Sequence, residues 1–77
     1  MSTTYDVRQS LLAQDSEFRR LSEEHAYCDM QLQEITRAIY LNAEDFIREA
    51  ELKKIKLRLK DEMELIVARY QHASVTH

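Results

Sequence analysis

Glycine and proline are both absent from this chain of 77 residues. At average usage a chain of this length would contain roughly nine of them. Glycine supplies left-handed backbone and proline breaks helices, so a chain without either has few of the conformations from which tight loops are built. The absence predicts an almost wholly helical protein. It also excludes glycine-rich phosphate-binding loops and dinucleotide-binding fingerprints.

Cysteine is nearly absent as well, because the chain contains only Cys28. No disulfide can form within one chain, and we therefore expect a reducing, cytoplasmic location. No apolar run approaches the length of a membrane span, and the first residues lack the basic and apolar stretches of a signal peptide. The sequence thus predicts a cytoplasmic protein without a membrane partner.

The composition that is present suits amphipathic helices, with 44% hydrophobic and 32% charged residues and a net charge of −3. A chain of this length has room for a single domain, residues 1–77. One core of this size supplies only a few kcal/mol of net stability, so oligomerisation is the expected reinforcement.

Two apolar stripes with alternating three- and four-residue steps predict two long helices, at about 16–41 and 46–70. Asp15 can cap the first helix, and Asn42, followed three residues later by Asp45, can cap the second. A one-residue difference in register between the stripes indicates a turn at 42–45, and residues 71–77 form a frayed tail. The stripes are Phe18, Leu21, His25, Cys28, Leu32, Ile35 and Ile39, then Leu52, Ile55, Leu59, Met63, Ile66 and Tyr70.

The similar lengths of these helices favour an all-α, antiparallel two-helix hairpin that resembles a coiled coil. Facing residues then have numbers that sum to about 85, which places Asp29 near Lys56. Val7, Leu11 and Leu12 have helical spacing, so a short N-terminal helical extension either continues the first helix or folds back. The alternative is one uninterrupted helix in a parallel coiled coil.

A basic run at residues 53–60 has two interpretations. Clustered cations on a helix can bind nucleic acid phosphates. The facing residues 15–34 carry a net charge of −4, however, and we favour pairing of the run with this acidic helix across the hairpin. The candidate nucleic-acid contacts are Lys53, Lys54, Lys56, Arg58 and Lys60.

His25, Cys28 and Asp29 lie within about one helical turn, a spacing at which side chains can share a metal ion. A zinc site needs three or four ligands, and the other histidines are near the C-terminus. We favour structural roles for these residues. We expect no metal, no cofactor, no small-molecule substrate and no enzymatic activity.

Some apolar residues lie off the main stripes, and a lone hairpin cannot bury them. They suggest an interaction surface that pairs two hairpins into a homodimeric bundle or binds a helical protein. The candidates for this surface are Tyr27, Met30, Phe46 and Leu57.

Two segments resemble the YdcH-like family of small uncharacterised bacterial proteins. The first is Phe18 with Leu21, His25 and Asp29, and the second is the run L-K-K-x-K-L-x-L-K-D-E at residues 52–62. The resemblance implies a helical hairpin and supplies no activity. It draws attention to a polar cluster that the hairpin brings together and that we expect to set its register. The cluster comprises His25, Asp29, Lys56, Lys60 and Asp61.

The function expected from the sequence is therefore a non-enzymatic helical module for protein–protein interaction or self-association. Nucleic-acid binding through residues 53–60 is the alternative.

Overall fold

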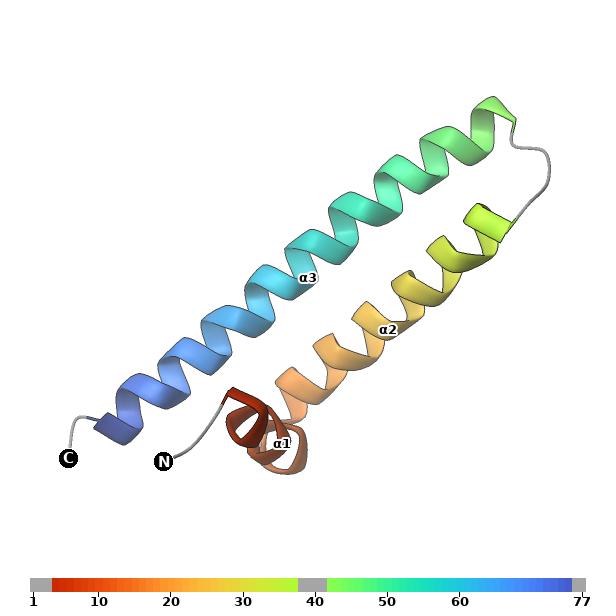
Figure 1. Cartoon of the computed structure of the whole chain (residues 1–77). Coiled ribbons are helices and arrows are strands. Elements are labelled where there is room, and N and C mark those ends of the chain that lie inside the picture. The colour runs from red at the N-terminus through yellow and green to blue at the C-terminus, as the bar shows by residue number, and fades with distance from the viewer. Residues whose placement is uncertain (1–3, 38–41, 76–77) are drawn as a thin grey trace.

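The computed structural model describes residues 4–37 and 42–75, and all three elements in these ranges are helices. They are α1 (Thr4–Gln14), α2 (Ser16–Arg37) and α3 (Ala43–Val75) (Figure 1). The described part of the chain contains no strand, which confirms the all-α prediction. The two-helix description was incomplete, because the N-terminal segment forms a third helix of its own.

A single residue, Asp15, separates α1 from α2. Its Oδ1 accepts a 2.9 Å hydrogen bond from the backbone N–H of Phe18, as an N-cap does. Its own N–H donates to the carbonyl of Leu11 at 2.8 Å, so the polar backbone stays satisfied through the corner. Asp15 therefore begins α2 where the sequence predicted, and the chain changes direction there.

Asn42 caps α3 by a reciprocal pair of hydrogen bonds. Its Oδ1 accepts from the N–H of Asp45 at 2.8 Å, and its own N–H donates to Oδ2 of Asp45 at 3.4 Å. Helical geometry therefore begins at Ala43, and the prediction of a turn over 42–45 was wrong for 43–45. The helix also continues to Val75, beyond the predicted end at residue 70. The predicted end of the first helix falls within 38–41, outside the described residues.

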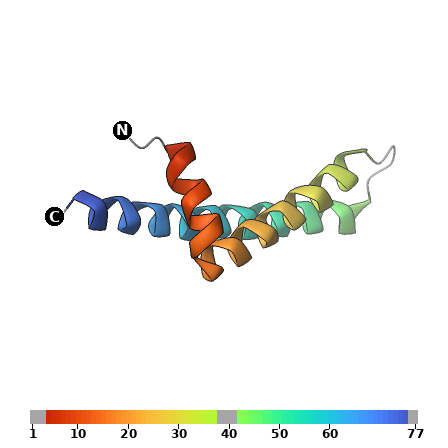
Figure 2. The ribbon, with the colours of Figure 1, turned by 90° about the horizontal axis from the view of Figure 1, so that it is seen from below.

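The helices α2 and α3 run antiparallel along their lengths (Figure 1). The alternative of one uninterrupted helix was therefore wrong. The N-terminal helix α1 turns back at Asp15, so that α1 and α2 form a V beside α3 (Figure 2). It contacts both long helices at the end of the hairpin that is remote from the connection between α2 and α3.

The core lies along the α2–α3 interface and widens where α1 joins it. Phe18 and Leu21 are each only 1% exposed, and α1 adds Val7 and Leu11 to the same cluster. This position explains why α1 folds back, because its two buried apolar residues cover the wide end of the core. The buried residues are Val7, Leu11, Phe18, Leu21, Cys28, Leu32, Leu52, Leu59, Met63 and Val67.

The buried stripe of α3 differs from the predicted one at two places. Ile55 is 38% exposed, and Lys56 takes the position between Leu52 and Leu59 that faces α2. Val67, which the predicted stripe omitted, is buried at 7% exposure in the cluster that includes α1. Steps of three and four residues are both helical, so spacing alone did not distinguish Ile55 from Lys56.

Candidate functional site: a polar layer and the outer face of α3

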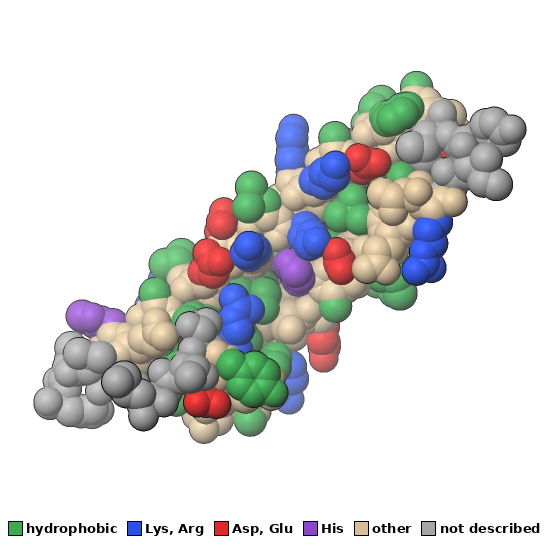
Figure 3. Space-filling view, in the orientation of Figure 1, with side chains coloured by type: hydrophobic (Ala, Val, Ile, Leu, Met, Phe, Trp, Pro, Cys, Tyr) green, Lys and Arg blue, Asp and Glu red, His purple; other side chains and the backbone are tan. Residues whose placement is uncertain are grey.

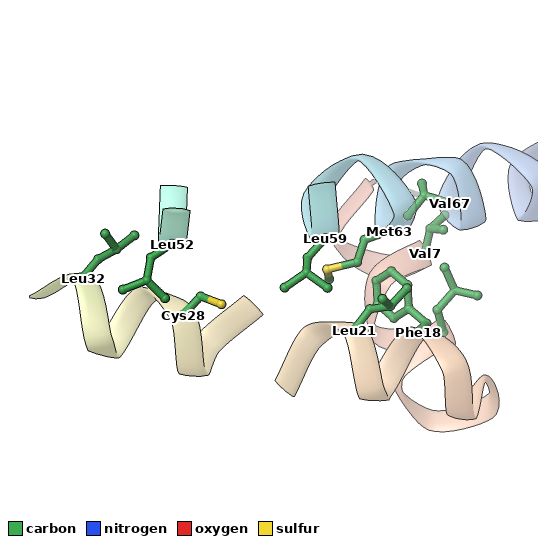
Figure 4. Packing of buried hydrophobic residues seen from close by; sticks show 10 residues of the cluster. Val7, Phe18, Leu21, Cys28, Leu32, Leu52, Leu59, Met63 and Val67 are labelled. Atoms are coloured by element: carbon green, nitrogen blue, oxygen red, sulfur yellow. The ribbon is translucent and has the colours of Figure 1, made fainter. Parts of the chain in front are cut away.

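The labelled core side chains fall into two groups along the hairpin (Figure 4). One contains Cys28, Leu32 and Leu52, and the other surrounds Phe18 and Leu59 at the α1 end. Beside the first group, where Asp29 follows Cys28 on α2, the ammonium Nζ of Lys56 donates a 2.5 Å hydrogen bond to Oδ1 of Asp29. Within the described residues this is the one ion pair that joins α2 to α3.

Electrostatics stabilise the charged form of Asp29. The hydrogen bond and the charge of Lys56 lower the pKa of this carboxyl below its usual 3.8, while partial desolvation opposes the shift. The charge of His25 and a 3.4 Å hydrogen bond from Gln33 add smaller effects in the same direction as Lys56. The side chains of Lys56 and Asp29 are 33% and 43% exposed, so water screens the pair.

Only part of the predicted polar cluster forms a bonded unit. Asp29 and Lys56 are paired, and His25 is close enough to act on Asp29 through its charge. Lys60 and Asp61 are exposed, and no ion pair or side-chain hydrogen bond joins either to another residue in the ranges described. The bonded group is therefore smaller than the predicted cluster, although Lys60 lies one helical turn beyond Lys56 on the same side of α3.

The basic run does not pair with α2 as a whole. Lys56 reaches across the hairpin, whereas Lys53 bonds Glu49 within α3 at 2.9 Å. For Lys54, Arg58 and Lys60, the structure records no ion pair among the residues it describes. The prediction that the run as a whole pairs across the hairpin was therefore wrong. Figure 3 shows Lys and Arg side chains interspersed with Asp and Glu on one face of the molecule.

The side of α3 that faces away from α2 carries large apolar side chains in water. Phe46 is 59% exposed, Ile47 61%, Leu57 60% and Leu65 54%. In Figure 3, hydrophobic side chains project along this edge with charged side chains between them. At about 100° per residue these positions lie opposite the buried stripe. We define the outer face of α3 as Phe46, Ile47, Ala50, Leu57, Leu65 and Ala68, all exposed, together with the intervening Lys54 and Asp61.

A shallow groove of about 360 Å³ lies between α2 and α3 on another side of the hairpin. Tyr27, 56% exposed, stands at this groove, and the buried Cys28 also lines it. Met30 is 52% exposed but does not line it. Of the predicted interaction surface, Phe46 and Leu57 thus share the outer face of α3, whereas Tyr27 and Met30 are on α2. The groove is lined by Glu23, Glu24, Tyr27, Cys28, Ile55 and Leu59.

Sequence reasoning missed the groove and the role of Lys56 as the residue that interrupts the apolar stripe. The groove depends on how α2 and α3 are placed side by side. The spacing of apolar residues within one helix does not predict that placement. The antiparallel register, in which the numbers of facing residues sum to about 85, did predict Asp29 as the partner of Lys56.

His25, Cys28 and Asp29 do not gather a metal site. Across 4–37 and 42–75, no three His, Cys, Asp or Glu side chains converge on a point where an ion would be held. Cys28 is instead buried in the core at 7% exposure. None of the three described helices combines the length and the hydropathy required to cross a bilayer.

The architecture and surfaces define a small all-helical protein with an antiparallel helix pair, an ion pair between Asp29 and Lys56 that joins the two helices, and an exposed apolar outer face. Residues 18–67, more than half of the chain, match the family described as "Protein of unknown function (DUF465)", and the chain belongs to that family. The match begins at Phe18 and ends at Val67, both core residues, and does not include α1. No curated protein and no solved structure matches the chain.

Proposed function

We propose that this protein is a non-enzymatic helical interaction module that binds another helix through the outer face of α3. The observation that carries the proposal is the exposure of four large apolar side chains on that face, from 54% at Leu65 to 61% at Ile47. They recur along one side of a 33-residue helix, which is the pattern of a helix that packs against a second partner.

The intramolecular packing supports this proposal, because α2 and α1 already cover the opposite side of α3. No further described element is available to cover Phe46 or Leu57, which remain 59% and 60% exposed. Single exposed apolar residues are common on proteins, but several along one helix face favour an interface. We also infer that the chain is a YdcH-like member of its family and acts in the cytoplasm, as its motifs and lone cysteine suggest.

Site-specific photocrosslinking in living cells tests the proposal. A photoreactive phenylalanine analogue replaces Leu57 on the outer face of α3, and a matched chain carries it at Tyr5, which is 69% exposed on α1. We expect irradiation to produce protein adducts from position 57 and few from position 5. Adducts at neither position, or equally at both, would overturn the proposal.

The same experiment separates the nucleic-acid alternative. That alternative rests on Lys54, Arg58 and Lys60, which have no ion pair within the described residues. An adduct at position 57 that nuclease digestion removes would favour binding to nucleic acid. An adduct that resists nuclease and yields to protease supports a protein interface.

A further inference from the structure

We propose that the partner of the outer face of α3 is the same face of a second copy, bound antiparallel about the centre of Leu57 and Arg58. This inference rests on the function proposed above and names its partner. The evidence is the order of charges and side-chain sizes along the face. When a second copy of the face is laid against it in the opposite direction, the positions described below place a positive side chain opposite a negative one and a large side chain opposite a small one.

In an antiparallel pair centred between Leu57 and Arg58, two residues that lie opposite each other have numbers that sum to 115. Lys54 then lies opposite Asp61 of the second copy, and two-fold symmetry repeats this contact. Both side chains are exposed, and neither forms an ion pair with another residue in the described ranges. Two identical faces therefore supply two opposite-charge contacts, one on each side of the centre.

Side-chain sizes follow the same symmetry. Ala50 lies opposite Leu65 of the second copy, and Ile47 lies opposite its Ala68. At these positions a large side chain meets a small one, which lets the two helices approach closely. Leu57, 60% exposed in one chain, lies near its own counterpart at the centre of the dimer.

A parallel pair lacks this complementarity. Each residue would then lie beside its own counterpart, so that Lys54 would face a lysine and Asp61 an aspartate. Like charges at these positions oppose association. The sequence of the face thus favours the antiparallel arrangement over the parallel one.

Charge reversal tests both the partner and its orientation. Lys54→Asp and Asp61→Lys each replace two attractive contacts of the antiparallel dimer with two repulsive ones. We expect each single variant to raise the dimer dissociation constant about 10-fold or more. The double variant Lys54→Asp/Asp61→Lys reverses both partners and is expected to return the constant to within about 3-fold of the wild-type value.

Sedimentation equilibrium at several protein concentrations measures these constants, and circular dichroism confirms that each chain remains helical. Both substituted positions are exposed, so the fold does not depend on them. A 1:1 mixture of the two single variants is expected to dimerise as well as the wild type. Wild-type chains that stay monomeric at about 100 µM, or a double variant as weak as the singles, would overturn the proposal.

The outcomes also separate this inference from the function on which it rests. Photocrosslinks from position 57 to a protein other than a second copy, with monomeric wild-type chain in the centrifuge, would reject the homodimer and retain an interaction module. A crosslinked species of about twice the 9.2 kDa chain mass supports both.

Discussion

Lys56 and Asp29 form the one ion pair between α2 and α3 in the described residues, with 2.5 Å between Nζ and Oδ1. Their positions are 27 residues apart in sequence and follow the register expected of an antiparallel hairpin. Lys56 occupies the face of α3 on which Leu52 and Leu59 are buried. The pair therefore places a half-exposed charged contact beside an apolar core that forms one cluster along the hairpin.

Asp29→Asn is expected to lower stability in a manner that depends on pH. The pKa of Asp29 is lowered in the folded chain, so the charged carboxylate favours folding above its ordinary pKa of 3.8. That contribution is lost as pH falls through the folded pKa. The difference in urea midpoint between wild type and variant is therefore largest above about pH 5 and shrinks at lower pH.

Gln33→Ala provides a control for that measurement, because it removes only the weaker hydrogen bond at 3.4 Å. Its effect should be smaller and should change less with pH. A wild-type advantage over Asp29→Asn that grows as the solution is acidified would contradict the assigned direction of the pKa shift.

Lys56→Leu is expected to raise the free energy of unfolding by about 1 kcal/mol. The new side chain would join Leu52 and Leu59 in a continuous apolar stripe, and its burial outweighs a screened ion pair. Urea unfolding at neutral pH and fixed protein concentration measures the change. Lys60→Leu is the matched control, since residue 60 is exposed and should gain less than about 0.5 kcal/mol.

A loss of stability in Lys56→Leu would instead show that the Asp29–Lys56 ion pair contributes more to stability than the apolar contact that replaces it. Such a result would support the idea that the Asp29–Lys56 pair fixes the register of the hairpin.

Phe18→Ala is expected to cost about 3–5 kcal/mol, which approaches the whole net stability of a chain this small. Phe18 is 1% exposed where α1, α2 and α3 meet, so the remaining side chains cannot close the cavity without moving a helix. Tyr5→Ala, at an aromatic residue that is 69% exposed, should cost less than about 0.5 kcal/mol. Thermal unfolding followed by circular dichroism compares them, and similar melting temperatures would refute the prediction.

Asn42→Ala is expected to destabilise the chain by about 1 kcal/mol, because it leaves the N–H of Asp45 without the 2.8 Å bond to Asn42. Asn42→Gly should cost only a few tenths of a kcal/mol, since glycine is an acceptable N-cap. Chemical unfolding measures both variants. If alanine were tolerated as well as glycine, the reciprocal cap would not contribute to stability.

The sequence by itself determined the helical class, the start of α2, the cap of α3 and the partner of Lys56. These features are set by local chemistry or by counting: no residue breaks helical periodicity, Asp15 and Asn42 supply capping oxygens, and an antiparallel register relates Asp29 to Lys56. The tertiary structure decided the rest. Packing placed Lys56 against Asp29 and left Ile55 38% exposed at the groove, because both spacings are helical and only the facing helix distinguishes them.

The tertiary structure also decided the path of α1 and which residues of the predicted polar cluster are bonded to one another. Val7 and Leu11 have helical spacing whether the chain continues or turns, and they are buried only because the wide end of the α2–α3 core accepts them. Lys60 and Asp61 belong to the predicted cluster, yet no ion pair or side-chain hydrogen bond in the described residues joins either of them to Asp29. Lys56 and Lys60 are one turn apart on the same side of α3, so helical spacing alone did not show which lysine reaches Asp29. Sequence therefore determined which helices form, and long-range packing determined which of their faces remain open to a partner.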